Sequence, residues 1–463
     1  MGGVDRAGVP PPPAPQQRPA PRDGGGAAND AGGSGPPPRA DDAAPAALTA
    51  AEAASALVPE GGAPVQIVQV VGNKLQLDEA AMLAVMARAP ADMKVAVVSV
   101  VGAFRTGKSF LLDLLLRYLQ HDERTSATLV TGADGGGGDG GGGGGGGGGG
   151  EGDAHDVAPP SPEAEGWEHI DAKPPCAVPA PPPTAPSSRS RNGDADAAWL
   201  FEGAGCVPGA LVAGTKATRA GFAWRGGRDR ETTGIWMWSH PFVRELPGRH
   251  GESVAVFLMD TQGMFDSETS QMLTASIFGL SALISSYQIY NVVRQIQEDN
   301  LQHLALFAEY GRVAFREAND AGGGGERVFP FQTLEFLVRD AIMDVEDLDA
   351  LGRDKMIADM QKYVADKMGC GAHADMRQIR EQVRECFAEF GCFTLPHPGV
   401  DVAEKKTYSG DIGGIRMEFR QFVDVYFDRI FHERLAPKSL LGRDITAAEL
   451  GDCILRCARP RCP

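Results

Sequence analysis

The stretch GAFRTGKS (102–109) restricts the fold of this chain more than any other part of its sequence. It matches the pattern GxxxxGK[ST] of a phosphate-binding loop, in which backbone N–H groups surround the phosphates of a nucleotide. The residues before it, KVAVVSVV (94–101), form a β-branched run typical of a buried parallel strand. The residues after it, SFLLDLLLRYLQ (109–120), have the pattern of an apolar helix. Strand, glycine-rich turn and helix in this order are the context that a phosphate-binding loop requires.

The segments on either side of the loop alternate between strand-like and helix-like patterns. Apolar and β-branched runs predict strands at 65–71, 234–242, 253–260, 282–290 and 331–340. Apolar residues at helical spacing predict helices at 77–89, 268–280, 298–317, 353–368, 374–390 and 411–434. Because strands that alternate with helices form parallel sheets covered on both faces, we expect an α/β P-loop fold with a mostly parallel central sheet flanked by helices.

Glycine and proline divide the chain into parts. The 60 glycines and 33 prolines are concentrated in residues 1–64 and in an interruption at 121–198 that contains a glycine run at 140–150. The first segment has too few apolar side chains to fold, so we expect a disordered tail. We expect the second to be a surface insertion, because the entropy of a loop rises only slowly with its length. A folded domain is therefore predicted at 65–435, followed by an irregular end at 436–463.

Charge and hydropathy exclude several classes of protein. The formal net charge of −17 argues against a general nucleic-acid or anionic-membrane surface, which would need basic patches. No apolar run approaches the roughly 18–20 residues that cross a bilayer. None of the eight cysteines has the spacing of a zinc site. The cluster of Cys453, Cys457 and Cys462 could be lipidated or bind a metal, but we favour a reduced cytosolic tail.

The residue types in the loop assign chemical roles. Lys108 is expected to reach the β- and γ-phosphates of a nucleotide, and the Ser109 hydroxyl is expected to bind Mg²⁺. The helix that follows adds its N-terminal N–H groups. The predicted nucleotide contacts from this segment are Gly102, Phe104, Arg105, Thr106, Gly107, Lys108, Ser109 and Phe110.

Two further segments predict the metal-binding side of the site. Asp260-Thr261-Gln262-Gly263 ends an apolar strand, where a carboxylate holds Mg²⁺ through water and the Gly263 amide contacts the γ-phosphate. Thr232 and Thr233 precede a glycine and a strand, so either hydroxyl could close over Mg²⁺ and the γ-phosphate as a switch does. We favour Thr232 as the metal ligand and catalytic residue.

The choice of base depends on Asp340, which ends the run FLVRD. Guanine presents two donors, N1–H and the 2-amino group, which one carboxylate accepts together, and adenine lacks this pair. Most GTPases use Asn-Lys-x-Asp at this place, whereas this chain has only Arg339-Asp340. From the residues alone, a strand-terminal aspartate also fits a helix cap.

The catalytic residue is the remaining question. In small GTPases a glutamine after DxxG orients the attacking water, but this chain has Met264, which cannot. Arg105, inside the phosphate loop, could swing onto the γ-phosphate as an arginine finger in cis. The alternative is that Arg105 points to solvent or pairs with an acidic residue.

Six segments together resemble the dynamin-related GTPases of the atlastin and guanylate-binding-protein group. They are GAFRTGKSFLLD (102–113), GFAWRGGRDRETTGIWMW (221–238), LMDTQGMFDS (258–267), QEDNLQHLALFAEYGR (297–312), FLVRD (336–340) and LPHPG (395–399). The stretch 281–312 and LPHPG are more similar to atlastin, and TGIWMW also resembles guanylate-binding proteins. The resemblance covers about residues 65–455 apart from the insertion.

The resemblance implies a GTPase that binds Mg-GTP and forms a homodimer through its G domain during hydrolysis. Arg105 maps to the family's arginine finger, and Arg339 with Asp340 to its base motif. His397 of LPHPG maps to a position near the base and the dimer face, and Arg225 to a switch arginine near the guanine-side loops or the partner.

The resemblance also implies a place in the cell. In atlastins a three-helix middle domain and two membrane segments follow the G domain, and the protein drives homotypic fusion of endoplasmic reticulum membranes. On this basis residues 436–463 would begin a truncated middle domain, and the protein would lie at the cytoplasmic face of that membrane. If the chain is complete, we expect a soluble cytoplasmic protein. A soluble guanylate-binding-protein-like GTPase and a nucleotide-binding scaffold with little turnover are the alternative functions.

Overall fold

The computed structural model describes a defined part of the chain: residues 62–72, 74–132, 221–222, 224, 232–264, 270–319, 329–343, 348, 350–369, 373–405, 408, 410–440 and 442–458. All of them belong to one compact unit, Thr49–Pro463. The predicted disordered tail up to residue 61, most of the predicted insertion (133–198) and the glycine run at 322–325 lie outside the described residues.

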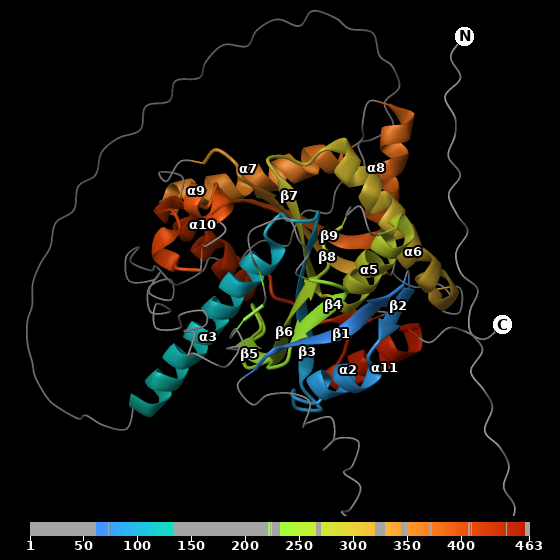
Figure 1. The fold of residues 1–463 in the computed structure, drawn as a ribbon, viewed down its shortest axis with the longest axis horizontal. Coiled ribbons are helices and arrows are strands. Elements are labelled where there is room, and N and C mark those ends of the chain that lie inside the picture. The colour runs from blue at the N-terminus through green and yellow to red at the C-terminus, as the bar shows by residue number, and fades with distance from the viewer. Residues whose placement is uncertain are drawn as a thin grey trace, which may run out of the picture. The chain divides into compact units, whose positions relative to one another are not determined.

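The centre of this unit is a twisted sheet with helices around it (Figure 1). In the described residues the strand order is β2-β1-β4-β6-β3-β7-β8-β9, with β5 also paired to β6. The strands are β1 (Pro64–Val71), β2 (Lys74–Leu77), β3 (Lys94–Gly102), β4 (Ile235–Trp238), β5 (Phe242–Glu245), β6 (Ser253–Thr261), β7 (Tyr287–Val293), β8 (Phe331–Arg339) and β9 (Phe387–Thr394). The neighbours from β6 through β9 are parallel, and β1, β2, β4 and β5 add antiparallel pairs. This confirms the predicted α/β class.

Helices cover both faces of the sheet. They are α2 (Glu79–Met86), α3 (Lys108–Gly132), α5 (Gln271–Ile284), α6 (Glu298–Asn319), α7 (Ala350–Met368), α8 (Ala374–Cys386), α9 (Val400–Glu404), α10 (Met417–Asp428) and α11 (Ala447–Ala458), with short turns η3 (Ile412–Gly414) and η4 (Arg429–Glu433). Successive side chains of a strand point to opposite faces of the sheet, so alternate residues pack against different helices.

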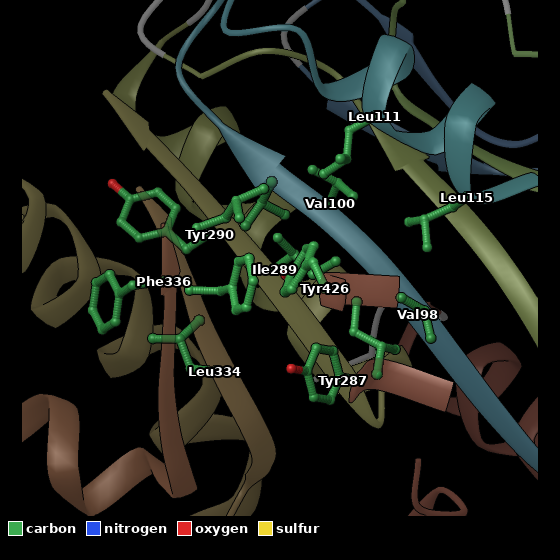
Figure 2. Packing of buried hydrophobic residues seen from close by; sticks show 14 of the residues in the cluster. Val98, Val100, Leu111, Leu115, Tyr287, Ile289, Tyr290, Leu334, Phe336 and Tyr426 are labelled. Carbon is green, nitrogen blue, oxygen red and sulfur yellow. The ribbon is translucent and has the colours of Figure 1, made fainter. Parts of the chain in front are cut away.

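One face of the sheet packs on α3 and α10. Val98 and Val100 of β3 lie in one cluster with Leu111 and Leu115 of α3, which point toward the strand in Figure 2. Tyr426 of α10 stacks on Phe393 of β9, with ring centroids 4.6 Å apart. The packing of Leu111 and Leu115 on β3 holds α3, the helix that follows the phosphate loop, against the central strand.

The opposite face packs on α5, α6, α2 and α11. Tyr290 of β7 contacts Phe278 of α5 and Phe336 of β8, with ring centroids 6.3 and 5.9 Å apart. A second cluster joins the alternate residues of β3 and β6 to α2, α5 and α11. Both faces are therefore apolar, which is why the central strands read as continuous hydrophobic runs.

Several predicted boundaries were wrong. The insertion predicted to begin at 121 begins later, because α3 continues to Gly132, and the strand predicted at 234–242 ends at Trp238, with β5 starting at Phe242. The strand predicted at 282–290 begins only at Tyr287, because α5 continues to Ile284. The helix predicted at 374–390 ends at Cys386, and Phe387 starts β9, which adds to the sheet beside β8. Short apolar runs do not separate the two periodicities, so in the last two places packing decides.

Residues 437–458 continue from the sheet into an ordered helix. Lys438 N–H donates to the Val95 carbonyl at 2.6 Å, and Val95 N–H donates to the Ile445 carbonyl at 3.1 Å. Thr446 and Glu449 then form a capping box at the start of α11, since each backbone N–H donates to the other's side chain. Leu450 and Ile454 of α11 are buried in the cluster that includes α2. The segment expected to be irregular therefore contains a helix that packs on the domain.

Lys438 is fully buried at the base of this segment. Its amine donates to the Ser285 carbonyl at 2.9 Å, and burial lowers the pKa of Lys438 to about 7. An unfolded lysine titrates near 10.4. Between these two pH values the unfolded chain holds a proton that the folded chain lacks, so this residue makes stability rise with pH.

Lys438→Met is expected to remove that contribution. The free energy of unfolding of the natural chain, minus that of Lys438→Met, should increase by about 1 kcal/mol per pH unit between pH 7.5 and 9.5. Urea unfolding of both proteins across that range measures the difference and cancels the other groups that titrate there. A difference that is independent of pH would contradict the assignment of a depressed pKa to Lys438.

Candidate functional site

The phosphate loop lies at the carboxyl edge of the sheet, between the end of β3 and the start of α3. Met264 N–H donates to the Gly102 carbonyl at 3.0 Å, and Phe104 N–H donates to the Met264 carbonyl at 2.9 Å. A side chain at Gly263 would stand 2.7 Å from the Phe104 Cα. The loop is therefore held against the DTQG segment by backbone contacts that admit only glycine at that point.

Three oxygens meet beside the loop. The Ser109 hydroxyl donates to Asp260 Oδ2 at 2.5 Å, and the Thr232 hydroxyl donates to the same oxygen at 3.2 Å. The two hydroxyls are 3.2 Å apart. Ser109 lies in the first turn of α3, Asp260 lies next to the end of β6, and Thr232 precedes β4. Because β4 pairs with β6, Trp236 lies opposite Asp260. Sheet pairing thus brings together three residues that are far apart in the sequence.

This group of oxygens fits Mg²⁺. Hydroxyl and carboxylate oxygens are the ligands that this ion prefers. Asp260 is buried, and its Oδ1 accepts no hydrogen bond within the described structure. Burial raises the pKa of Asp260, while Ser109 and Lys108 oppose that rise. A buried carboxylate with a spare oxygen is the state that a bound cation would stabilise.

Lys108 lies inside the phosphate loop and is buried. Its amine donates to the Ala103 carbonyl at 3.0 Å, and burial lowers the pKa of Lys108 to about 8 while Asp260 opposes the decrease. The Thr106 hydroxyl donates to the same Ala103 carbonyl at 2.9 Å. An anion in the loop would favour the charged form of this amine.

The two threonines before β4 differ in direction. Thr232 contacts Ser109 and Asp260, as above, whereas the Thr233 side chain is exposed. The Thr233 carbonyl accepts from Gln66 Nε2 and from Trp236 Nε1, both at 2.8 Å. Thr232 is therefore the one whose hydroxyl reaches the cluster of oxygens.

Arg105 is exposed at the tip of the loop and has a left-handed backbone with φ of 64°. Its guanidinium lies over the Phe104 ring, 5.0 Å from the centroid. Met264, the position where small GTPases have glutamine, is 2% exposed and contacts the loop through its backbone. A buried side chain with no polar atom cannot orient water, so Met264 does not fill the role that glutamine has there.

Arg339 ends β8 at the same edge, and Asp340 follows it. The Arg339 guanidinium donates to the Thr106 carbonyl and fills the space that a side chain at Gly107 would need. Burial lowers the pKa of Arg339, while Asp340 opposes the decrease. Asp340 has a left-handed backbone with φ of 59°, and its buried Oδ1 accepts no hydrogen bond in the described structure. The guanidinium also lies 3.8 Å from Asp340 Oδ1, so the arginine contacts both the phosphate loop and the carboxylate.

His397 follows β9, next to the segment that contains Arg339 and Asp340. The backbone of Leu395 joins β9 to the end of β8, since Leu395 N–H donates to the Val338 carbonyl at 2.8 Å and the Leu395 carbonyl accepts from Ala341 N–H at 3.1 Å. His397 Nδ1 accepts from Gly399 N–H at 3.1 Å, so Nε2 carries the ring proton and is left as a donor.

The remaining predicted contacts are less direct. Phe110 is buried, and its ring contacts Trp224 and Phe419 at centroid distances of 5.2 and 6.4 Å, so only its backbone faces the loop side of α3. Arg225 lies outside the described residues.

One contact was missed in the sequence. Asn291 of β7 donates through Nδ2 to the Thr106 carbonyl at 2.9 Å. The only signal is a polar residue inside the apolar strand YQIYNVV, and its meaning depends on knowing that β7 lies next to β3.

Comparison with known proteins places this geometry in a family. A family model described as guanylate-binding protein, N-terminal domain, matches residues 72–439. The chain is 33% identical over 389 residues to atlastin of Drosophila melanogaster, covering 83% of this chain and 54% of that protein. It is 31% identical over 391 residues to atlastin-2 of Homo sapiens (84% and 50%) and 32% identical over 391 residues to human atlastin-3 (84% and 55%). The chain spans about half the length of these relatives. Among the described helices, none has the length and apolar character needed to cross a membrane.

Proposed function

The chain belongs to the guanylate-binding-protein N-terminal domain family of GTPases, which includes its atlastin relatives, and on this premise we propose that it binds Mg-GTP and hydrolyses it. The observation that carries the proposal is the meeting of the Ser109, Thr232 and Asp260 oxygens beside a phosphate loop. A Gly-rich turn with no ligand would have no reason to bury an acidic side chain there.

The residues of the loop act on the phosphates. The N–H groups of the loop and of the first turn of α3 bind phosphate oxygens, and Lys108 exchanges the Ala103 carbonyl for the β- and γ-phosphates. Ser109 and Thr232 would hold Mg²⁺ directly and Asp260 through water. The ion, when bound, neutralises charge that develops on the phosphate oxygens. Thr232 also positions the segment before β4 over the γ-phosphate.

Arg105 supplies the charge that stabilises the transition state. It extends from the loop tip onto the γ-phosphate and takes the role of an arginine finger in cis. Its exposed position at the tip of the loop suits a group that a partner covers. We propose that a second copy of this chain is that partner, paired through the G domain as the family resemblance implies.

Asp340 recognises the guanine base. Its carboxylate, whose buried Oδ1 accepts no hydrogen bond in the described structure, accepts the N1–H and 2-amino donors of guanine, with His397 nearby as a further donor to the nucleotide or the partner. Phe104, Thr106, Gly107 and Gly263 line the phosphate side, and Arg225 and Thr233 are proposed contacts of the closing segment.

The proposed cellular role is based on the atlastin relatives. We propose that in a longer protein the paired G domains draw endoplasmic reticulum membranes together for fusion, at the cytoplasmic face. A soluble guanylate-binding-protein-like GTPase is the alternative, and it shares the same site and pairing.

Nucleotide turnover by the full chain tests the proposal. We expect GTP but not ATP to be hydrolysed, with a specific activity that rises with protein concentration and is lost when EDTA removes Mg²⁺. GTP binding with negligible turnover at every concentration would instead indicate a nucleotide-binding scaffold, and absence of GTP binding would end the proposal.

Asp340→Asn is expected to change the base that is recognised. An amide accepts one guanine donor poorly but donates to the 2-carbonyl of xanthine. Two hydrogen bonds to a charged group are worth about 1.5–3 kcal/mol each, so GDP affinity should decrease by about 10²-fold or more while xanthosine diphosphate gains. Competition binding with the two diphosphates measures the switch, and an unchanged preference for GDP would show that Asp340 serves as a structural cap.

A further inference from the structure

The carbonyl of Thr106 is held by two donors from neighbouring strands. Asn291 Nδ2, from β7, lies 2.9 Å from this oxygen, and the Arg339 guanidinium, from the end of β8, donates to it as well. Asn291 Nδ2 also lies 3.4 Å from the Thr106 hydroxyl. Both donors belong to the sheet, so the carbonyl is fixed to the rigid part of the domain.

The position of this carbonyl controls the next N–H group. The peptide between Thr106 and Gly107 is trans, because the described residues contain no cis peptide bond. In a trans peptide the C=O and N–H point in opposite directions. Holding the Thr106 oxygen toward β7 and β8 therefore directs the Gly107 N–H to the other side, into the loop. Gly107 has φ of 77°, a conformation from which glycine could rotate easily without such an anchor.

The side-chain oxygen of Asn291, Oδ1, gives a second observation about the role of this residue. Asn291 is 1% exposed, and its Oδ1 accepts no hydrogen bond within the described structure. Burying an unpaired amide oxygen destabilises a fold, and an apolar residue would suit an apolar strand better. The amide is therefore explained by what its Nδ2 does at Thr106.

We propose that Asn291 is a positioning residue for phosphate binding. It acts through the Thr106–Gly107 peptide, and with Arg339 it ties the phosphate loop to the strand that carries Asp340. Arg339 thereby serves the loop rather than the base. The inference rests on the proposed function, since it names a residue that prepares the same nucleotide site.

The first experiment compares two buried amides of one strand. Gln288 of β7 is also 1% exposed and has an unpaired Oε1, but its Nε2 donates at 3.0 Å to Ser281 of α5, away from the loop. We expect Asn291→Leu to weaken GDP binding about tenfold, the size of one lost hydrogen bond. The preference for GDP over xanthosine diphosphate should stay the same, and Gln288→Leu should bind GDP as the natural chain does. Equal losses in both variants, or none in Asn291→Leu, would overturn the proposal.

A double-mutant cycle tests whether Asn291 and Arg339 hold the same carbonyl. Two residues with separate structural roles would not show the expected coupling in GDP affinity. After either Asn291→Leu or Arg339→Gln alone, the other donor still holds the Thr106 carbonyl. The double variant leaves that carbonyl without either donor, so its loss of GDP affinity should exceed the product of the two single losses. Losses that multiply without excess would show that the two residues do not share this peptide. A natural chain that binds no guanine nucleotide would overturn the proposed function itself, and it would be seen before any variant is compared.

Discussion

Replacing Arg105 with alanine is expected to lower the rate of GTP hydrolysis about 10³-fold or more, while GDP affinity changes little. Arginine fingers contribute about 10³–10⁵ to turnover in GTPases. The charge acts on the transition state rather than on the bound nucleotide, so kcat should fall and binding should be spared. Single-turnover hydrolysis, with GDP binding measured in parallel, separates the two effects.

The chain offers a closely matched control for this variant. Arg294, after β7 at the same edge of the sheet, is also an exposed arginine with φ of 64°. Its N–H donates to the Arg339 carbonyl at 2.7 Å through the backbone, which alanine would keep. Arg294→Ala therefore imposes the same backbone change and the same loss of charge, and we expect hydrolysis within about twofold of the natural chain.

The dependence on protein concentration adds a second readout. If a partner copy orders Arg105, the specific activity of the natural chain should rise with concentration, and that of Arg105→Ala should remain flat. If Arg105→Ala hydrolyses GTP as fast as the natural chain, then Arg105 only faces solvent or pairs with an acidic residue, and another group must stabilise the transition state.

The core of the site could be predicted because its residues belong to motifs read along the backbone. Lys108 and Ser109 follow a fixed turn, and Asp260 must end a buried strand. Thr232 was harder to choose, because Thr233 stands next to it with the same chemistry. Only the pairing of β4 with β6 decides which hydroxyl meets Asp260.

What could not be predicted depends on which strands are neighbours. Asn291 has no motif of its own and gains its partner because β7 pairs with β3, so that Asn291 lies opposite Gly102. Arg339 was assigned to the nucleotide by resemblance, yet its guanidinium reaches the Thr106 carbonyl. The sequence alone also did not indicate β9, because its aromatic residues follow a helix without a turn signal.

A buried ion pair joins β8 to η4 in the core of the domain. Glu335 of β8 and Arg429 of η4 form a 2.8 Å contact, and their side chains are 0% and 3% exposed. Burial lowers the pKa of Arg429, but Glu335 together with Tyr287 and Glu433 more than offsets that effect, so the pKa is raised overall. Glu335 Oε2 occupies the space of a side chain at Gly391, so the carboxylate has little room to turn elsewhere.

Arg429→Met is expected to lower the free energy of unfolding by about 3–5 kcal/mol, because it leaves an unpaired charge in the core. Arg353→Met is the control. Arg353 pairs with Asp428 and Glu433 at 3.2 Å each, but its side chain is 25% exposed. A partly solvated pair is worth about 1 kcal/mol or less. Urea unfolding at pH 7 compares the two variants.

Removing both charges separates the cost of an unpaired charge from the value of the pair. Glu335→Leu combined with Arg429→Met should recover most of the stability lost in Arg429→Met, since replacing both members of a buried pair with apolar residues is often neutral. A double variant as unstable as the single one would mean that the pair itself stabilises the domain. Recovery would instead mean that the pair adds little stability and that its effect is to fix how η4 docks against β8, the strand that ends at Arg339.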